Sequence, residues 1–179
     1  MRVELMEVYG TWRGVADSAN TTINREPGSR EPSKEWKRKI LKAEHSPIRQ
    51  LAYRIKLYDL PYWVSVHLVR HKIGIEHWVR TQRSDRTGEN RDELPQGAFV
   101  EHEILVNAQA MITISRKRMC TCASPETRIA WRYVLNCIKE VNPELFEACV
   151  PECVYRGFCP EFKPCGYEVE NHRLEEYRR

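Results

Sequence analysis

Apolar and polar residues alternate over 51–57, and no other pattern in the sequence limits the possible folds of the chain as strongly. Ala52, Arg54 and Lys56 would point to one side of an extended backbone. The opposite side would carry only apolar or aromatic residues, namely Leu51, Tyr53, Ile55 and Leu57. A period of two is typical of a strand with one buried face. The pattern therefore predicts a half-buried strand over these residues.

Other segments give weaker indications of structure in the first half of the chain. Residues 2–9 favour a first strand, and the polar stretch 17–33, which holds two prolines and a glycine, predicts a loop. Residues 34–43 predict a charged helix with Ser33 as its N-cap. Its inward-facing residues would be Trp36, Ile40 and Leu41.

Helices dominate the prediction for the rest of the chain. Pro61 suits a helix start, so 62–71 predicts an apolar helix that delivers basic residues at its end, followed by an extended segment at 76–82. A polar, turn-rich stretch at 84–97 precedes a predicted helix over 100–118. Ser124 followed by Pro125 indicates another helix start, and a last helix should open at Pro143.

Length and composition limit the class of protein. A chain of 179 residues suits one domain, which we expect over 1–167, with a charged tail at 168–179. Apolar residues make up 41% and charged residues 30%, the balance of a globular protein. Neither a membrane-spanning run nor a signal peptide is evident, so we expect a cytoplasmic protein without a membrane partner. The net charge of +4 suits anionic small molecules as well as nucleic acid.

A basic cluster stands out between residues 70 and 83. Arg70, His71 and Lys72 are consecutive, and Arg80 and Arg83 follow closely. Guanidinium groups match phosphate oxygens with a fork of donors, and lysine supplies a point charge. The cluster therefore indicates a phosphate site, although a solvated basic face would give the same composition.

Residues 70–83, RHKIGIEHWVRTQR, resemble the signature of the flavin-dependent thymidylate synthases, or ThyX, which runs from Arg-His-Arg to Ser-x-Arg. Further segments resemble that family in the same order along the chain. Residues 17–22 are similar to its early flavin-contacting loop, and 44–47 to its His-x-Ser/Thr-Pro segment, with Glu44 in place of the histidine. Asn107-Ala108 and Arg118 match its Asn-Ala-Arg segment and the downstream nucleotide-binding arginine, with Gln109 in place of the first arginine. Residues 123–128 and 143–157 resemble its closing helices.

The resemblance implies an α+β fold, a small antiparallel sheet packed with helices that assembles into a homotetramer with shared sites. It implies FAD as the bound cofactor, with NADPH and 5,10-methylenetetrahydrofolate as cosubstrates, and one-carbon transfer to C5 of dUMP. It further implies that the flavin contacts four residues, Arg70, His71, Lys72 and Asn107. The nucleotide would contact His67, Thr81, Gln82, Arg83 and Arg118, with Arg118 also the catalytic residue.

The sequence departs from the family pattern in ways that keep other functions open. Lys72, Ile75 and His77 replace signature residues, and the segment between Arg83 and Asn107 is short, so that Arg86 or Arg91 would have to supply a further phosphate contact. The acceptor would then be dUMP or another pyrimidine nucleotide such as dCMP, and the product methylated or hydroxymethylated. An inactive relative that keeps the tetramer but not the flavin is a further alternative. A basic nucleic-acid-binding module with a zinc-stabilised tail is the alternative from a different class.

Cysteines are concentrated near the C-terminus. The chain has 7 cysteines and no secretion signal, which argues against a disulfide framework. Four thiols between residues 149 and 165 could form a structural zinc site: Cys149, Cys153, Cys159 and Cys165. Cys149 and Cys153 would lie one helical turn apart, and Cys120 and Cys122 would either contribute or be buried.

Overall fold

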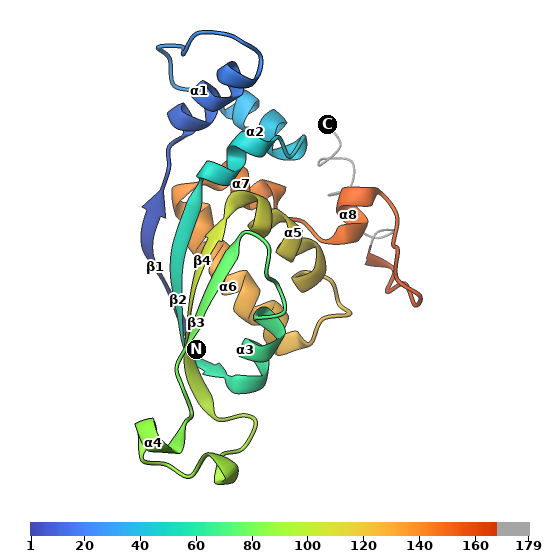
Figure 1. Ribbon diagram of the computed structural model, residues 1–179. Coiled ribbons are helices and arrows are strands. Elements are labelled where there is room, and N and C mark those ends of the chain that lie inside the picture. Colours follow the sequence, from blue (N-terminus) through green and yellow to red (C-terminus); the bar gives the residue numbers. More distant parts are fainter. Residues whose placement is uncertain (168–179) are drawn as a thin grey trace.

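The computed structural model describes residues 1–167 and is built on one antiparallel sheet of four strands (Figure 1). The strands are β1 (Arg2–Tyr9), β2 (Ala52–Pro61), β3 (Ile75–Val79) and β4 (Phe99–Asn107). Their order across the sheet is β1-β2-β4-β3. The two long strands β2 and β4 therefore form the centre, and the short β3 forms one edge.

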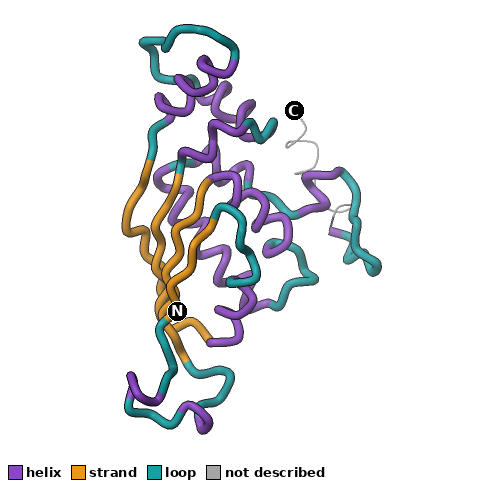
Figure 2. The backbone as a smooth tube through the Cα atoms, viewed as in Figure 1, coloured by secondary structure: helices purple, strands orange, loops and turns teal. Residues whose placement is uncertain are grey.

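The main helices pack on one face of this sheet and leave the other face open (Figure 2). The covering helices are α3 (Tyr62–Leu68), α5 (Ala108–Arg118), α6 (Pro125–Val141) and α7 (Pro143–Ala148). The remaining helices lie at the ends of the sheet or beyond α5: α1 (Trp12–Thr22), α2 (Lys34–Lys42), α4 (Ser84–Thr87) and α8 (Glu152–Arg156). No helix in the described part of the chain has the length and apolarity to cross a membrane. The predicted α+β class, a small antiparallel sheet with helices, is confirmed.

The alternation over residues 51–57 has the predicted consequence. Tyr53, Ile55 and Leu57 are buried against the helices, where Trp131 of α6 is also buried. Side chains on the open face form ion pairs across the strands, such as Arg54 Nε to Glu103 Oε1 at 2.6 Å. The apolar face is thus the core of the fold, and the polar face is solvated.

The predicted loop over residues 17–33 is wrong at its start, because α1 continues to Thr22. The N-cap Thr11 accepts a hydrogen bond from the backbone N–H of Gly14, and Arg13 pairs with Asp17 one turn later. A single buried residue, Val15, anchors this helix. So few apolar positions give no helical periodicity to detect in the sequence.

The predicted helix over residues 100–118 is also wrong in its first half, which is strand β4. Val100, Ile104 and Val106 are buried while their neighbours Glu101, Glu103 and Leu105 are only partly buried. The helix begins after Asn107, whose side chain accepts a hydrogen bond from the backbone N–H of Ala110. An apolar run that ends a central strand and continues into a buried helix shows no single period.

The remaining predictions of local structure hold with changes of boundary, and the extended segment predicted over 76–82 is strand β3, which ends at Val79. Ser33 caps α2 and Ser124 caps α6 as predicted, and α7 opens at Pro143. Helix α3 ends at Leu68 rather than at residue 71, because the chain must turn there to enter β3 antiparallel to β4. Arg70 and His71 therefore lie in a loop, and the predicted tail 168–179 lies outside the described residues.

Candidate functional site

Arg118, the last residue of α5, lies at the centre of the candidate site. Its Nε donates a hydrogen bond to His71 Nε2 at 2.8 Å, and its Nη2 donates to the carbonyl oxygen of His67 at 2.7 Å. These contacts join the end of α5 to the end of α3 and to the loop after it. Arg118 is thereby brought together with two other predicted site residues, His71 and His67, which lie 47 and 51 positions before it in the sequence.

The site has an excess of positive charge. Burial lowers the pKa of the Arg118 guanidinium, and the nearby charge of Arg70 lowers it further. Neither arginine forms an ion pair with an acidic side chain anywhere in residues 1–167. Two like charges near one another without a protein counterion favour an anionic ligand.

His71 is neutral in this arrangement. Burial, followed by the charges of Arg118, His77 and Arg70, lowers the pKa of His71 to about 4. A neutral imidazole can accept the Arg118 hydrogen bond at Nε2, which fixes the proton at Nδ1. His71 thus orients the guanidinium without adding charge.

A chain of hydrogen bonds supports His71 from the core. His77 Nε2 donates to the His71 carbonyl oxygen at 2.8 Å, and His77 Nδ1 lies 3.0 Å from His102 Nε2. His102 Nδ1 in turn lies 3.1 Å from Ser65 Oγ. If each imidazole is neutral, only one direction satisfies all three bonds, with Ser65 donating to His102 and His102 to His77. Sequence reasoning did not find Ser65 or His102, whose partners are distant in the sequence.

The start of helix α6 also borders the site. His67 Nδ1 lies 3.0 Å from Thr127 Oγ1, which also accepts a hydrogen bond from Ser124 Oγ at 2.9 Å. Ser124 caps this 17-residue helix and Pro125 is its first residue. The site is therefore framed by the ends of α3 and α5 and by the N-terminus of α6, an end that carries partial positive charge.

Gly74 and Asn107 meet beside the basic loop. Gly74 has φ +71°, and a Cβ added there would lie 2.6 Å from Nδ2 of Asn107. The backbone N–H of Asn107 donates to the Gly74 carbonyl oxygen at 2.9 Å. Asn107 thus lies next to the loop that carries Arg70, His71 and Lys72, and it also caps α5.

The remaining predicted residues lie elsewhere in the chain. Thr81, Gln82 and Arg83 follow the opposite end of β3 from Gly74, and five residues of strand span about 16 Å. Thr81 and Gln82 line a small cavity of ≈ 150 Å³ near Phe99, while Arg83 pairs with Asp85 at 2.8 Å.

Two departures from the family pattern contact each other. Gln109 Nε2 donates a hydrogen bond to Glu44, and Glu44 also pairs with Arg116 of α5. The side chains of Glu44 and Arg116 are 19% and 13% exposed, so the pair is largely shielded from water. The replacement of the family histidine by Glu44 and of the arginine by Gln109 therefore forms one local polar cluster.

The four cysteines predicted to hold zinc do not form a metal-ligand group in the described residues. Helix α7 ends at Ala148, so Cys149 and Cys153 do not share a helix as that prediction assumed. Cys149 packs in the main core, whereas Cys153 belongs to a second small cluster. The break at Val150 and Pro151 separates the two thiols.

Comparison with known proteins agrees with this architecture. No family model matches the chain. A flavin-dependent thymidylate synthase from Nitratidesulfovibrio vulgaris is 32% identical over 85 residues, which is 45% of this chain and 35% of that protein. The match thus spans about a third of the curated relative's length.

Solved structures extend the comparison to the fold. ThyX from Helicobacter pylori, complexed with FAD and dUMP, superposes with a TM-score of 0.69 at 13% identity, covering 84% of this chain and 100% of that one. The UMP/dUMP methylase PolB from Streptomyces cacaoi, bound with 5-Br dUMP, gives 0.63 at 14% identity, covering 87% and 94%. The chain is thus similar to flavin-dependent thymidylate synthases in part of its sequence and shares the fold of ThyX.

Proposed function

We propose that this protein transfers a one-carbon unit to C5 of a pyrimidine deoxynucleotide, dUMP in the first instance. FAD would be the bound cofactor, and methylenetetrahydrofolate and NADPH the cosubstrates. The observation that carries the proposal is the pair Arg70 and Arg118, which lie near each other without a carboxylate partner in the described residues. A phosphate or pyrophosphate is the ligand that such a pair suits.

The structure has features that fit a flavin nucleotide beside this pair. The loop before β3 carries Arg70 and the exposed Lys72, and its backbone passes so close to Asn107 that only glycine fits at position 74. Such a loop offers cationic side chains and backbone groups to a pyrophosphate. When bound, the flavin would supply the redox chemistry of the reaction. Arg70, His71, Lys72 and Asn107 are the residues proposed to hold it.

Arg118 is the residue proposed to bind and polarise the nucleotide. Two of its three nitrogens already donate to His71 and His67, and Nη1 has no partner among residues 1–167. The fixed guanidinium can therefore direct its remaining donors at a ligand without further ordering. Arg118 holds the carbonyl oxygen of His67, and Thr127 holds its ring. His67 is thereby fixed beside Arg118, where it would contact the same nucleotide.

A shared site would account for Thr81, Gln82 and Arg83. They lie beyond β3 from Arg118, so in the proposed homotetramer they would contact the nucleotide bound to a neighbouring subunit. Light scattering of the purified protein should give four times the mass of the 21.2 kDa chain. A monomer that still binds flavin and nucleotide would refute sharing.

An absorption titration tests the function. FAD is added to the purified protein, and the bound spectrum is recorded again with dUMP, dCMP and UMP. We expect a flavin spectrum that one of these nucleotides perturbs, which identifies the acceptor. No flavin binding, together with salt-dependent binding of oligonucleotides, would favour the nucleic-acid-binding alternative.

Amino-acid substitutions test which residues bind the nucleotide and which bind the flavin. Arg118→Ala should weaken nucleotide binding by about 10- to 100-fold, the value of one or two charge-assisted hydrogen bonds, and leave the fold intact. Arg70→Ala should lose flavin first. Arg38→Ala is the matched control, because Arg38 pairs with Glu147 away from the site. Unchanged nucleotide affinity in Arg118→Ala would remove this residue from the site.

A further inference from the structure

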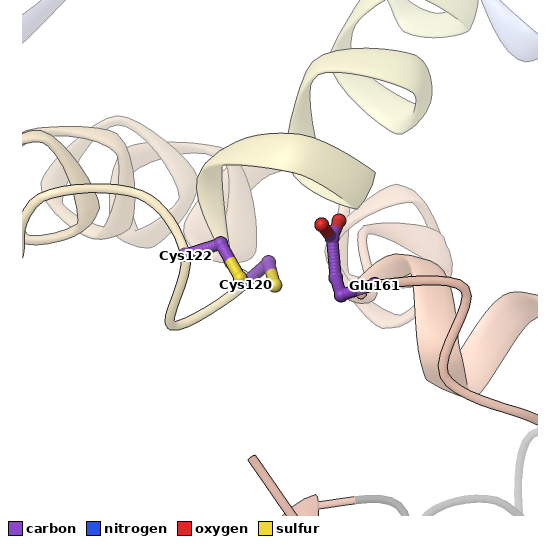
Figure 3. A group of neighbouring side chains, drawn as sticks. All are labelled: Cys120, Cys122 and Glu161. Carbon is purple, nitrogen blue, oxygen red and sulfur yellow. The ribbon is translucent and has the colours of Figure 1, made fainter. Parts of the chain in front are cut away.

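A second group of chemically reactive side chains lies outside the candidate site. Cys120 and Cys122 are in the turn between α5 and α6, and Glu161 follows α8 (Figure 3). Their sulfur and carboxylate ligand atoms all lie within 4.8 Å of one another. In Figure 3 the two sulfur atoms lie next to each other and face the segment that carries Glu161. Among residues 1–167 this is the one group of three that meets metal-ligand distances.

The turn itself brings the two thiols together. The backbone N–H of Ala123 donates to the carbonyl oxygen of Cys120 at 3.0 Å, which closes a tight turn around Cys122. Cys120 is partly buried and Cys122 is exposed, so both side chains can adjust their rotamers. A tetrahedral zinc site separates two sulfur ligands by about 3.8 Å, given a Zn–S bond of about 2.3 Å. The two sulfur atoms lie within 4.8 Å of each other, so a shift of about 1 Å or less would bring them to that spacing.

We propose that Cys120, Cys122 and Glu161 bind one zinc ion, with Cys159 as the fourth ligand. Zinc accepts thiolate and carboxylate together in a tetrahedral site, whereas Cu(I) prefers sulfur alone and Mg²⁺ or Ca²⁺ prefers oxygen. Cys159 is partly buried two residues before Glu161, and it lines the same cavity of ≈ 370 Å³ as Cys120 and Glu161.

The surrounding charges are consistent with such a site. Glu161 forms no ion pair with another side chain of the described residues, so its carboxylate is available as a ligand. A zinc ion with three thiolates and a carboxylate carries net negative charge. Arg128 and Arg132 line the same cavity, and Arg128 Nε is buried without a hydrogen-bond partner. These guanidinium groups would balance the charge of the occupied site.

The role of the ion would be structural. The segment after α8 contains little regular structure, and its Phe158 and Phe162 are 56% and 106% exposed. Zinc would tie this segment to the turn between α5 and α6, replacing core contacts that the segment does not make. Four protein ligands also leave no open position for catalysis.

Metal analysis of the full-length protein tests the proposal. Purified from medium with added zinc and dialysed, the protein should contain about one zinc ion per chain. The double variant Cys120→Ser/Cys122→Ser should lose the ion. Cys137→Ser is the matched control and should keep it, because the Cys137 thiol faces the carbonyl oxygen of Val3 on the opposite side of α6.

A second variant and a spectroscopic probe cover the case in which the double variant does not fold. Glu161→Gln alters a loop side chain and should lower zinc affinity by at least about 10-fold, because even the loss of an outer-shell partner typically costs about 10- to 100-fold. Cobalt in place of zinc should give thiolate-to-metal absorption that weakens in Cys159→Ser. A folded wild-type protein without zinc, or a double variant that keeps its zinc through Cys149 and Cys153, would overturn the proposal.

Discussion

Replacement of Gly74 by alanine is the perturbation whose cost follows most directly from the structure. Gly74 has φ +71°, a conformation that a residue with a Cβ adopts only with strain. The new Cβ would lie 2.6 Å from Nδ2 and 2.9 Å from Oδ1 of Asn107. The Asn107 side chain cannot move away freely, because its Oδ1 accepts the hydrogen bond from Ala110 that caps α5 at 2.9 Å.

The expected loss of unfolding free energy has two parts. The left-handed conformation costs about 1–2 kcal/mol for alanine. Displacement of the Asn107 cap costs about 0.5–2 kcal/mol more. Gly74→Ala should therefore destabilise the fold by about 1.5–4 kcal/mol, which lowers Tm by roughly 3–16 °C in a chain of this size.

Urea unfolding followed by circular dichroism separates the two parts. Gly88→Ala is the matched control, because Gly88 has φ +76° but a Cβ added there meets nothing within 4 Å. Gly74→Ala should lower the free energy of unfolding more than Gly88→Ala does, and the difference should equal the contribution of the Asn107 cap. In an Asn107→Ala background that difference should disappear, since the clash is gone. Equal costs for the two glycine variants in the wild-type background would refute the reasoning.

Two further predictions concern buried charge. Burial, with a smaller contribution from His77, lowers the pKa of His102 to about 4, below the usual value of about 6.5 for an unfolded chain. The unfolded chain therefore takes up the proton first, and about 2–3 kcal/mol of stability should be lost as pH falls from about 6.5 to 4. Urea unfolding over this range should show a flatter pH dependence in His102→Gln, and an unchanged slope would contradict the assignment. Glu44→Ala should cost about 2–4 kcal/mol by leaving the shielded Arg116 without its carboxylate. Glu35→Ala, whose partner Lys39 is 74% exposed, should lower the free energy of unfolding far less, and similar losses for both variants would refute the distinction.

Local signals in the sequence were sufficient for several elements. The alternation over 51–57 predicted a strand with a buried face, and Ser33 and Ser124 predicted two helix starts that the structure contains. These features depend on residues within a few positions of each other. A cap or an alternating face needs no distant partner to be recognised.

The boundary between β4 and α5 could not be predicted in this way. Residues 100–112 are apolar enough for either element, and pairing of β4 with both β2 and β3 decides that the first part is extended. A central strand gains its hydrogen bonds from two neighbours that are remote in the sequence. Local periodicity contains no information about those neighbours.

The candidate site was also predictable only in part from the sequence. Resemblance to the family selected Arg70, His71, Asn107 and Arg118 from the sequence, and the fold places the first two and Arg118 in one cluster. The contacts of His102 with Ser65 and His77, of Glu44 with Gln109, and of Cys120 and Cys122 with Glu161 are features of the tertiary structure alone. Each joins residues at least 25 positions apart in the chain. The sequence determined which side chains were available, and packing of the helices against one face of the sheet determined which of them meet, because burial fixes long-range neighbours that no local pattern specifies.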